Sequence, residues 1–80
     1  MRLDKYLKVS RIIKRRTVSN DACDAGRVAV NGKVQKAGYQ VKTGDVLELT
    51  FGEKTHSFKV LIVDEMEARK TGLPMFEEIV

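Results

Sequence analysis

The chain has 80 residues, of which 42% are hydrophobic and 32% are charged, a composition typical of one small globular domain rather than a disordered segment. It contains no apolar run near the ~18 residues that a membrane span requires, no apolar signal-peptide core at its start, and a single cysteine, which excludes an internal disulfide. We therefore expect a reduced, cytoplasmic, metal-free protein without membrane contact, folded as one domain over residues 1–80 and too small for a deep substrate cavity.

Charge is distributed unevenly along the chain. Residues 1–42 hold eleven Lys or Arg against three Asp or Glu, a net charge of +8, whereas residues 43–80 hold four against eight, a net charge of −4. A strongly basic half on a small domain indicates an anionic partner, and nucleic acid is the first candidate.

The first residues predict a short helix followed by a basic junction. Leu3, Tyr6 and Leu7 repeat at the spacing of one helix face, so we expect them in the core, with the Tyr6 hydroxyl at the surface. Ser10 is suited to cap a short turn that follows this helix. The run Lys14-Arg15-Arg16 would then lie at the junction with the next helix.

The pattern from Thr17 to Gly26 predicts a second short helix. Thr17 is an N-cap candidate, because its hydroxyl can accept a hydrogen bond from a free backbone N–H of the first turn. Val18, Ala22 and Ala25 follow at helical spacing and would form the buried face. Gly26 supplies the left-handed residue that commonly ends a helix.

Beyond the second helix the apolar period changes to two, which indicates strands. Val28 and Val30 alternate with their neighbours, and Asn31-Gly32 predicts a tight hairpin because both turn positions favour positive φ. Residues 36–42 are polar and irregular. The segment Val46–Phe51 predicts a further strand whose apolar face holds Leu47, Leu49 and Phe51.

The remaining residues complete the expected fold. Phe58–Val63 is the most apolar strand and is expected at the centre of the sheet. Asp64–Lys70 predicts a helical turn closed by Thr71-Gly72, and the tail Leu73–Val80 is free either to dock or to fray. The predicted class is α+β, with two short N-terminal helices packed on a small, mostly antiparallel sheet of about four or five strands.

The candidate binding residues are basic side chains of the first 36 positions. If the two helices pack on the sheet, these side chains would form one stripe that binds phosphates with little sequence information. A merely solvated helix face is the alternative, but the scarcity of acidic residues in this half favours nucleic acid. The set comprises Arg2, Lys5, Lys8, Arg11, Lys14, Arg15, Arg16, Arg27, Lys33 and Lys36.

Few aromatic side chains are available to stack on bases. Phe51 and Phe58 alternate with other strand residues and are expected in the core, which leaves Tyr39 as the one fair stacking candidate. A structured RNA that is recognised by its shape and phosphate positions therefore fits better than a single strand.

Three further residues are assigned structural roles. His56 lacks a recognisable orienting carboxylate, and the carboxylates of Asp21 and Asp24 near Cys23 disfavour its thiolate, so catalysis is not expected. Asp4 lies in the first helical turn, where it can complement the helix dipole, pair with Lys8 or orient a neighbouring arginine.

The order of these residues resembles the alpha-L RNA-binding motif of S4-type domains over about residues 1–50. The resemblance is carried by the segments Arg2–Leu7, Arg11, Arg15–Thr17, Ala22–Gly32 and Val41–Leu47. It implies two helices and a hairpin that present basic residues to structured RNA. Over essentially its whole length the chain is similar to the small stand-alone RqcP/YabO-type factors of ribosome-associated quality control.

That similarity implies a non-enzymatic, cofactor-free protein, expected to be a monomer, that binds the rRNA of obstructed large ribosomal subunits. It would also bind and stabilise the P-site (peptidyl-)tRNA while an RqcH-type tailing factor adds alanines to the stalled chain. Arg2 and Arg16 are the first expected RNA contacts, because guanidinium groups bind phosphate oxygens in a bidentate geometry. Lys5, Arg11, Arg15 and Arg27 come next, and the remaining lysines of the set are peripheral.

Three alternatives stay open. A heat-shock-type ribosome-rescue protein would bind dissociated large subunits that carry peptidyl-tRNA, but it has a longer and basic C-terminal extension. A ubiquitin-like sulfur carrier shares the small β-rich body but requires a Gly-Gly terminus, whereas this sequence ends in Glu-Glu-Ile-Val. A protein-interaction module could use the acidic half and bind no RNA.

Overall fold

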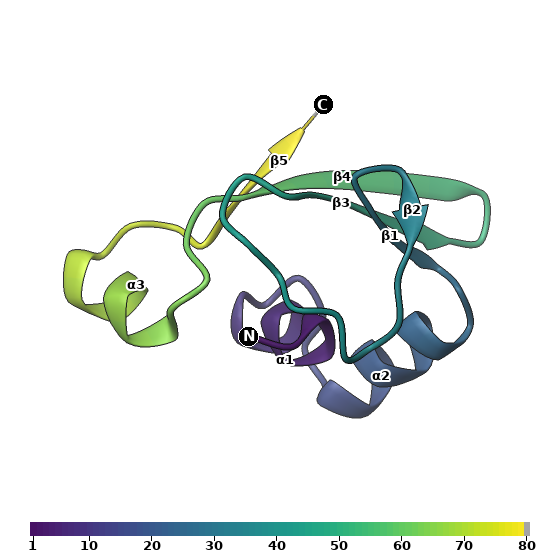
Figure 1. Ribbon diagram of the computed structural model, residues 1–80, viewed down its shortest axis with the longest axis horizontal. Coiled ribbons are helices and arrows are strands. Elements are labelled where there is room, and N and C mark those ends of the chain that lie inside the picture. Colours follow the sequence, from purple (N-terminus) through teal and green to yellow (C-terminus); the bar gives the residue numbers. More distant parts are fainter. Residues whose placement is uncertain (80) are drawn as a thin grey trace.

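The computed structural model describes residues 1–79, which form two short helices against one face of a five-stranded sheet, with a third helix at one end (Figure 1). The elements are α1 (Leu3–Val9), α2 (Arg16–Asp24), β1 (Val28–Val30), β2 (Lys33–Val34), β3 (Val46–Phe51), β4 (Lys54–Val60), α3 (Glu65–Thr71) and β5 (Phe76–Ile79). The strand order is β2-β1-β3-β4-β5, and every neighbouring pair is antiparallel, which confirms the expected α+β class. Every helix within residues 1–79 is too short or too polar to span a bilayer.

The buried face of α1 is the predicted one. Leu3, Tyr6 and Leu7 are fully buried. The prediction for the Tyr6 hydroxyl is wrong, because this group is buried and donates a 2.7 Å hydrogen bond to the carbonyl of Met75. Burial raises the pKa of the Tyr6 hydroxyl. The bond ties α1 to the segment that precedes β5.

Ser10 ends α1 instead of starting the next turn. Its backbone N–H donates to the carbonyl of Tyr6 at 2.9 Å, and its Oγ donates to the carbonyl of Leu7 at 3.3 Å. The expected capping role of Ser10 is therefore wrong, since its hydroxyl bonds to a carbonyl in the last turn of α1, which also accepts the N–H of Ile13.

The start of α2 also differs from the prediction. The helix begins at Arg16, after an extended Arg15 whose side chain makes no capping hydrogen bond. Thr17 lies inside the helix, so it is not the N-cap. Gly26 follows the helix with φ of 73°, as predicted for its end.

The buried face of α2 is rotated relative to the prediction. Val18 is 43% exposed and Ala25 is also exposed, whereas the buried side chains are Ser19, Ala22 and Cys23. The rotation follows from the contact with α1, because Ser19 Oγ donates a 2.8 Å hydrogen bond to the backbone carbonyl of Asp4. A buried hydroxyl needs such a partner, and this one fixes the packing of the two helices.

The hairpins of the sheet form as predicted, but one of the two aromatic residues expected in the core is exposed. Asn31 and Gly32 have φ of 53° and 84°, and Val30 pairs with Lys33 across that turn. Phe58 is buried, whereas Phe51 is 41% exposed and was wrongly expected in the core. Phe51 pairs with Lys54 beside the β3–β4 turn, at the end of the hairpin that extends past the helices (Figure 1).

The centre of the sheet is β3, not the apolar segment 58–63. β4 ends at Val60, and the N–H groups of Leu61 and Ile62 both donate to the carbonyl of Met75, at 2.8 and 3.1 Å. The apolar residues after Val60 therefore leave the ladder and lead into α3, which removes them from the central strand.

The C-terminal third forms a helix and an edge strand within its described residues. Asp64 caps α3 by accepting hydrogen bonds from the N–H groups of Met66 and Glu67, and Gly72 ends the helix with φ of 71°, as predicted. The tail then forms β5, which pairs with β4. Of the expected tail, Val80 lies outside the described residues.

The irregular segment 36–42 covers the start of α1. Ala37 and Val41 are buried in the core, which their polar surroundings did not indicate. The N–H of Leu3 donates to the carbonyl of Tyr39 at 2.8 Å, and the N–H of Asp4 donates to that of Ala37 at 3.3 Å. These bonds satisfy free donors at the start of α1 and fix the position of the basic residues there.

Candidate functional site

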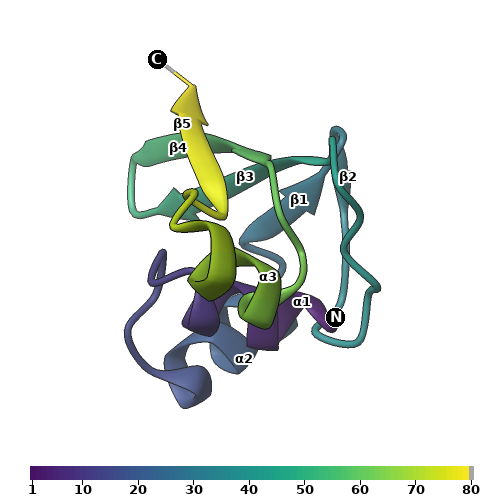
Figure 2. The same cartoon turned by 90° about the vertical axis from the view of Figure 1, so that its left-hand side faces the viewer.

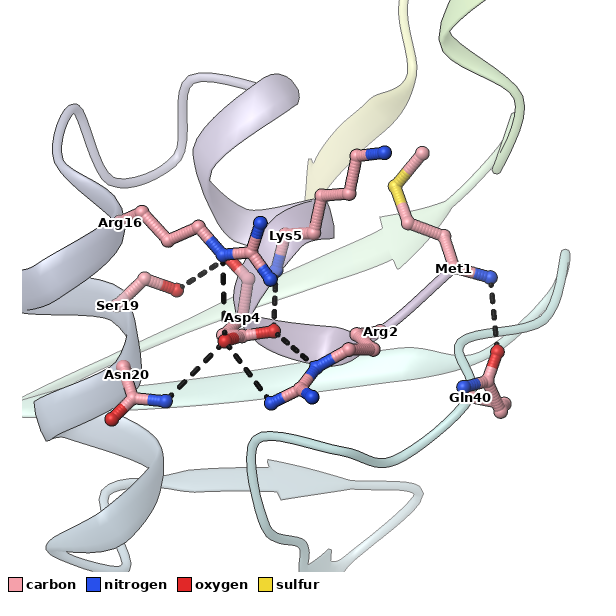
Figure 3. A network of polar contacts seen from close by, with 8 residues as sticks. All are labelled: Met1, Arg2, Asp4, Lys5, Arg16, Ser19, Asn20 and Gln40. Atoms are coloured by element: carbon pink, nitrogen blue, oxygen red, sulfur yellow. Dashed lines mark hydrogen bonds and ion pairs between the residues drawn. The ribbon is translucent and has the colours of Figure 1, made fainter.

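The carboxylate of Asp4 joins the two arginines that rank first among the candidates. Arg2 Nε lies 3.2 Å from Oδ1, and Arg16 Nε lies 3.5 Å from Oδ2. The Asp4 side chain is only 3% exposed, whereas those of Arg2 and Arg16 are 51% and 52% exposed. Figure 3 shows both guanidinium groups beside the Asp4 carboxylate. One buried anion thus holds two cations at the surface, and the predicted option that Asp4 orients an arginine is confirmed.

Asp4 has further partners on both helices. Its Oδ1 accepts a 2.8 Å hydrogen bond from the N–H of Lys5, and its Oδ2 accepts one of 3.3 Å from Asn20 Nδ2. Burial acts to raise the pKa of Asp4, but the bonds from Asn20, Arg2 and Lys5 and the charge of Arg16 outweigh it, so the pKa lies below the ordinary value. The carboxylate is therefore ionised at neutral pH.

This geometry prepares both guanidinium groups for an anion. The Nε atoms face Asp4, and about half of each side chain remains open to solvent. A guanidinium that is held on one edge can offer its remaining N–H groups to a phosphate with little further loss of side-chain entropy. The cluster of Asp4, Arg2 and Arg16 is called the arginine clamp below.

All ten candidate side chains are exposed, but the structure divides them instead of forming one row. Lys5 and Arg15 are sequence neighbours of the clamp, and Lys36 precedes Ala37, whose carbonyl accepts the N–H of Asp4. A second group, Lys8, Arg11 and Lys14, lines a cavity that faces α3. The others lie on the sheet side, with Arg27 just before β1 and Lys33 in the edge strand β2.

Asn20 and Ser19 are site residues that sequence reasoning missed. Asn20 lies one helical turn after Arg16, so both side chains reach the same carboxylate, while Ser19 holds the Asp4 backbone. The i, i+4 spacing of Arg16 and Asn20 was the available signal. This spacing could not be interpreted from the sequence, because it does not show that Asp4, which lies 16 residues before Asn20, faces α2.

His56 and Cys23, the residues considered for catalysis, are not part of the arginine clamp. His56 Nδ1 lies 3.5 Å from Glu78 Oε2 across β4 and β5, a pairing that the sequence did not show. Burial, with the charges of Asp4 and Asp24, raises the pKa of Cys23 to about 11, so its thiol is protonated at neutral pH. Within residues 1–79, no three His, Cys, Asp or Glu side chains are grouped to hold a metal ion.

Tyr39, the candidate for stacking on a base, makes contacts within the fold at both its hydroxyl and its ring. Its hydroxyl donates a 3.0 Å hydrogen bond to Asp45 Oδ2, and its ring packs partly buried against the core. Burial, together with the bond to Asp45 and its charge, raises the pKa of the Tyr39 hydroxyl. Tyr39 is therefore half-buried, and its stacking on a base stays a prediction.

Known proteins with similar sequences match most of the chain. The family model of the S4 domain matches residues 1–47, which contain the whole arginine clamp. The chain is 52% identical over 76 residues to the RQC P-site tRNA stabilizing factor of Bacillus subtilis, covering 95% of this chain and 88% of that protein. It is 34% identical over 65 residues to the Heat shock protein 15 homolog of Aeromonas salmonicida, covering 81% of this chain and 49% of that protein.

A solved structure shares the fold. The trimeric structure of Vibrio cholerae Heat Shock Protein 15 matches with a TM-score of 0.82 at 24% identity, covering 100% of this chain and 82% of that one. At this identity the likeness concerns the fold alone, and it extends over the helices and the sheet that carry the clamp.

Proposed function

The chain belongs to the S4 domain family and, within it, to the RQC P-site tRNA stabilizing factors, and from this premise we propose that it is an RNA-binding factor of ribosome-associated quality control. It binds the ribosomal RNA of obstructed large subunits together with the P-site tRNA and holds that tRNA in place. Such a factor shifts the tRNA only as far as its affinities for the two tRNA positions differ, so its effect is a binding effect.

The arginine clamp is the observation that carries this proposal. A buried carboxylate that presents two half-exposed guanidinium groups is built for an anion, and phosphates are the anions that structured RNA displays. Arg2 and Arg16 are proposed as the central contacts. The proposed surrounding contacts are Lys5, Lys8, Arg11, Lys14, Arg15, Arg27, Lys33 and Lys36.

Several finer properties form part of the proposal. The protein acts as a monomer without a cofactor and catalyses no reaction, because the one carboxylate of the clamp, Asp4, is buried and already bonded to Arg2, Arg16, Asn20 and the Lys5 N–H. It acts in the cytoplasm, where its ribosomal partner is found. Its stabilised tRNA serves an RqcH-type factor that adds alanines to the stalled chain.

The heat-shock-type alternative fits less well. The matched part covers only 49% of the Aeromonas salmonicida protein, whereas it covers 88% of the Bacillus subtilis factor at higher identity.

Binding to purified large subunits tests the proposal. We expect tighter binding to subunits that carry a P-site tRNA than to vacant subunits, because the protein contacts both RNAs. The logarithm of the affinity should fall linearly with the logarithm of salt, with a slope near −3 to −5 for about four to six phosphates. Equal affinity for loaded and vacant subunits would show that the protein does not bind the P-site tRNA. An affinity that does not depend on salt would show that it does not bind RNA phosphates.

Arg11 offers a second test, because its backbone is strained. It follows the end of α1 with φ of 68°, the left-handed conformation that usually holds glycine. Arg11→Gly should therefore raise the free energy of unfolding by about 1 kcal/mol while it weakens RNA binding several-fold. Urea unfolding and fluorescence anisotropy measure the two effects.

Arg11→Lys is the matched control, since it keeps both the charge and the strain. It should leave stability unchanged and retain most of the affinity. If Arg11→Gly binds RNA as tightly as the native protein, Arg11 is not a phosphate contact.

A further inference from the structure

A groove of about 940 Å³ lies between the end of α1 and α3. One wall is formed by the last residues of α1 and the junction that follows, and the opposite wall is formed by α3 and the segment that leads to β5. Figure 2 shows α3 in front of α1 at this end of the molecule. α3 lies outside residues 1–47, which match the S4 domain, so the groove exists only because the C-terminal third is added to that domain.

The charge of the groove suits an anion. Its walls carry Lys8, Arg11 and Lys14 from the α1 side and Arg69 from α3. The carboxylate that also lines it, Glu65, is already engaged by Arg69 at 3.5 Å. Lys8, Arg11 and Lys14 thus add three positive charges to the Arg69–Glu65 pair.

Part of the lining of the groove is apolar. It includes Val9, Ala68, Leu73 and Met75, of which Leu73 is 59% exposed. A duplex presents a convex row of phosphates, which does not fit a concave site with apolar lining. An unpaired nucleotide does suit it, because its base has an apolar face and its phosphates can stay at a cationic rim.

We propose that this groove receives an unpaired nucleotide of the same structured RNA that the arginine clamp binds. Lys8 lies three residues after Lys5, ~4.5 Å along the α1 axis, and Lys5 adjoins Asp4 of the clamp, so one RNA can reach both the clamp and the groove. The planar guanidinium of Arg69 and the side chain of Leu73 contact the base. The inference rests on the proposed RNA-binding function and adds a site for a flipped-out base to it.

Two hairpin RNAs with the same closed loop, one with an uninterrupted stem (the paired hairpin) and one with a single bulged nucleotide added to that stem (the bulged hairpin), provide the test with the full chain. We expect the native protein to bind the bulged hairpin ~5-fold or more tighter than the paired one. Arg69→Gln and Leu73→Ser should each reduce this ratio toward one. The matched controls on the outer side of α3, Lys70→Gln and Met66→Ser, should keep it, because neither side chain lines the groove.

Amide chemical-shift mapping locates the bound base. The bulged hairpin should shift the signals of Ala68, Gly72 and Leu73, whereas the paired hairpin should leave these three signals in place and still shift those around the arginine clamp. A short polyglutamate peptide should leave the groove signals in place. If the peptide shifts them and the bulged hairpin does not, the groove binds an acidic peptide and the inference is wrong.

The possible failures are distinguishable. If both hairpins bind equally well and Arg2→Gln weakens both, the proposed function stands and the groove has no role in base binding. If the native protein binds neither hairpin, the proposed RNA-binding function fails and the groove inference fails with it.

Discussion

Replacing Asp4 with asparagine is expected to weaken RNA binding about 5- to 100-fold, although it raises the net charge from +4 to +5. Without the carboxylate, Arg2 and Arg16 lose the partner that holds their Nε atoms, and each must be ordered when the RNA binds. Immobilising a long side chain costs about 0.5 to 1.5 kcal/mol, which for two arginines gives the expected range. A simple charge argument predicts the opposite sign.

Asp24→Asn is the matched control for this prediction. It raises the net charge equally on the exposed end of α2 but touches neither arginine, so RNA binding should be unchanged or slightly tighter. Fluorescence anisotropy with a structured RNA compares the two variants. Equal affinities for Asp4→Asn and Asp24→Asn would show that the clamp does not position the arginines.

The affinities of the Asp4→Asn and Asp24→Asn variants should be compared at neutral pH, where Asp4 is ionised. Its folded-state pKa lies below the ordinary aspartate value of 3.8, so its contribution to stability is present above that pH and is lost as the pH falls through the folded pKa. At pH 7 a difference between the variants therefore reports the loss of a carboxylate. Urea unfolding at the same pH verifies that each variant is folded during the binding measurement.

The double variant Arg2→Gln, Arg16→Gln is expected to lose about 100-fold or more in affinity for the large subunit. Hydrogen bonds to charged groups contribute about 1.5 to 3 kcal/mol each, and two central phosphate contacts are removed. The salt slope should become shallower by about 1.4 to 1.8, since each lost phosphate contact removes about 0.7 to 0.9. Asp4 retains the Lys5 N–H and Asn20 as partners, so the fold should survive.

The control for this variant is Lys54→Gln, Lys59→Gln. Both lysines are exposed on β4, and Lys59 alternates with buried Phe58 and Val60, so it lies on the face turned away from the helices. The control removes the same charge and should lose less than ~3-fold in affinity, with nearly the native salt slope. An equal loss in both variants would attribute binding to net charge and contradict a localised site.

Local patterns were sufficient for much of the fold. The spacing of Leu3, Tyr6 and Leu7 predicted α1, and Asn31-Gly32 predicted its hairpin, because each feature depends on residues that are close in sequence. The errors concern distant partners. The rotation of α2 is set by Ser19 bonding to Asp4, and the Tyr6 hydroxyl finds a carbonyl that lies 69 residues away.

Errors in the predicted sheet also arose because local sequence does not show how distant segments pack. Apolarity placed Phe58–Val63 at the centre, but the residues after Val60 leave the sheet toward α3, and β3 is central. Phe51 alternates correctly with Leu47 and Leu49 yet lies beyond the helices that cover the other two. Periodicity indicates which face a residue occupies, but not how far the opposite layer extends.

The site was predicted in its parts but not in its assembly. Arg2 and Arg16 were the first expected contacts because guanidinium groups suit phosphates. Their common anchor was one of three options for Asp4, and Asn20 had no assigned role, since both depend on how α1 and α2 pack. The division of the basic side chains between the clamp and the groove depends on α3, which local sequence does not place.

Sedimentation of a tagged protein from a cell lysate through a sucrose gradient tests the central claim most directly. The account predicts that the native protein migrates with free large subunits that carry tRNA at low and moderate salt, and that the Arg2→Gln, Arg16→Gln variant stays at the top. If both proteins stay at the top, the ribosome is not the partner. If both migrate with the subunit, the arginine clamp is not the site that binds it.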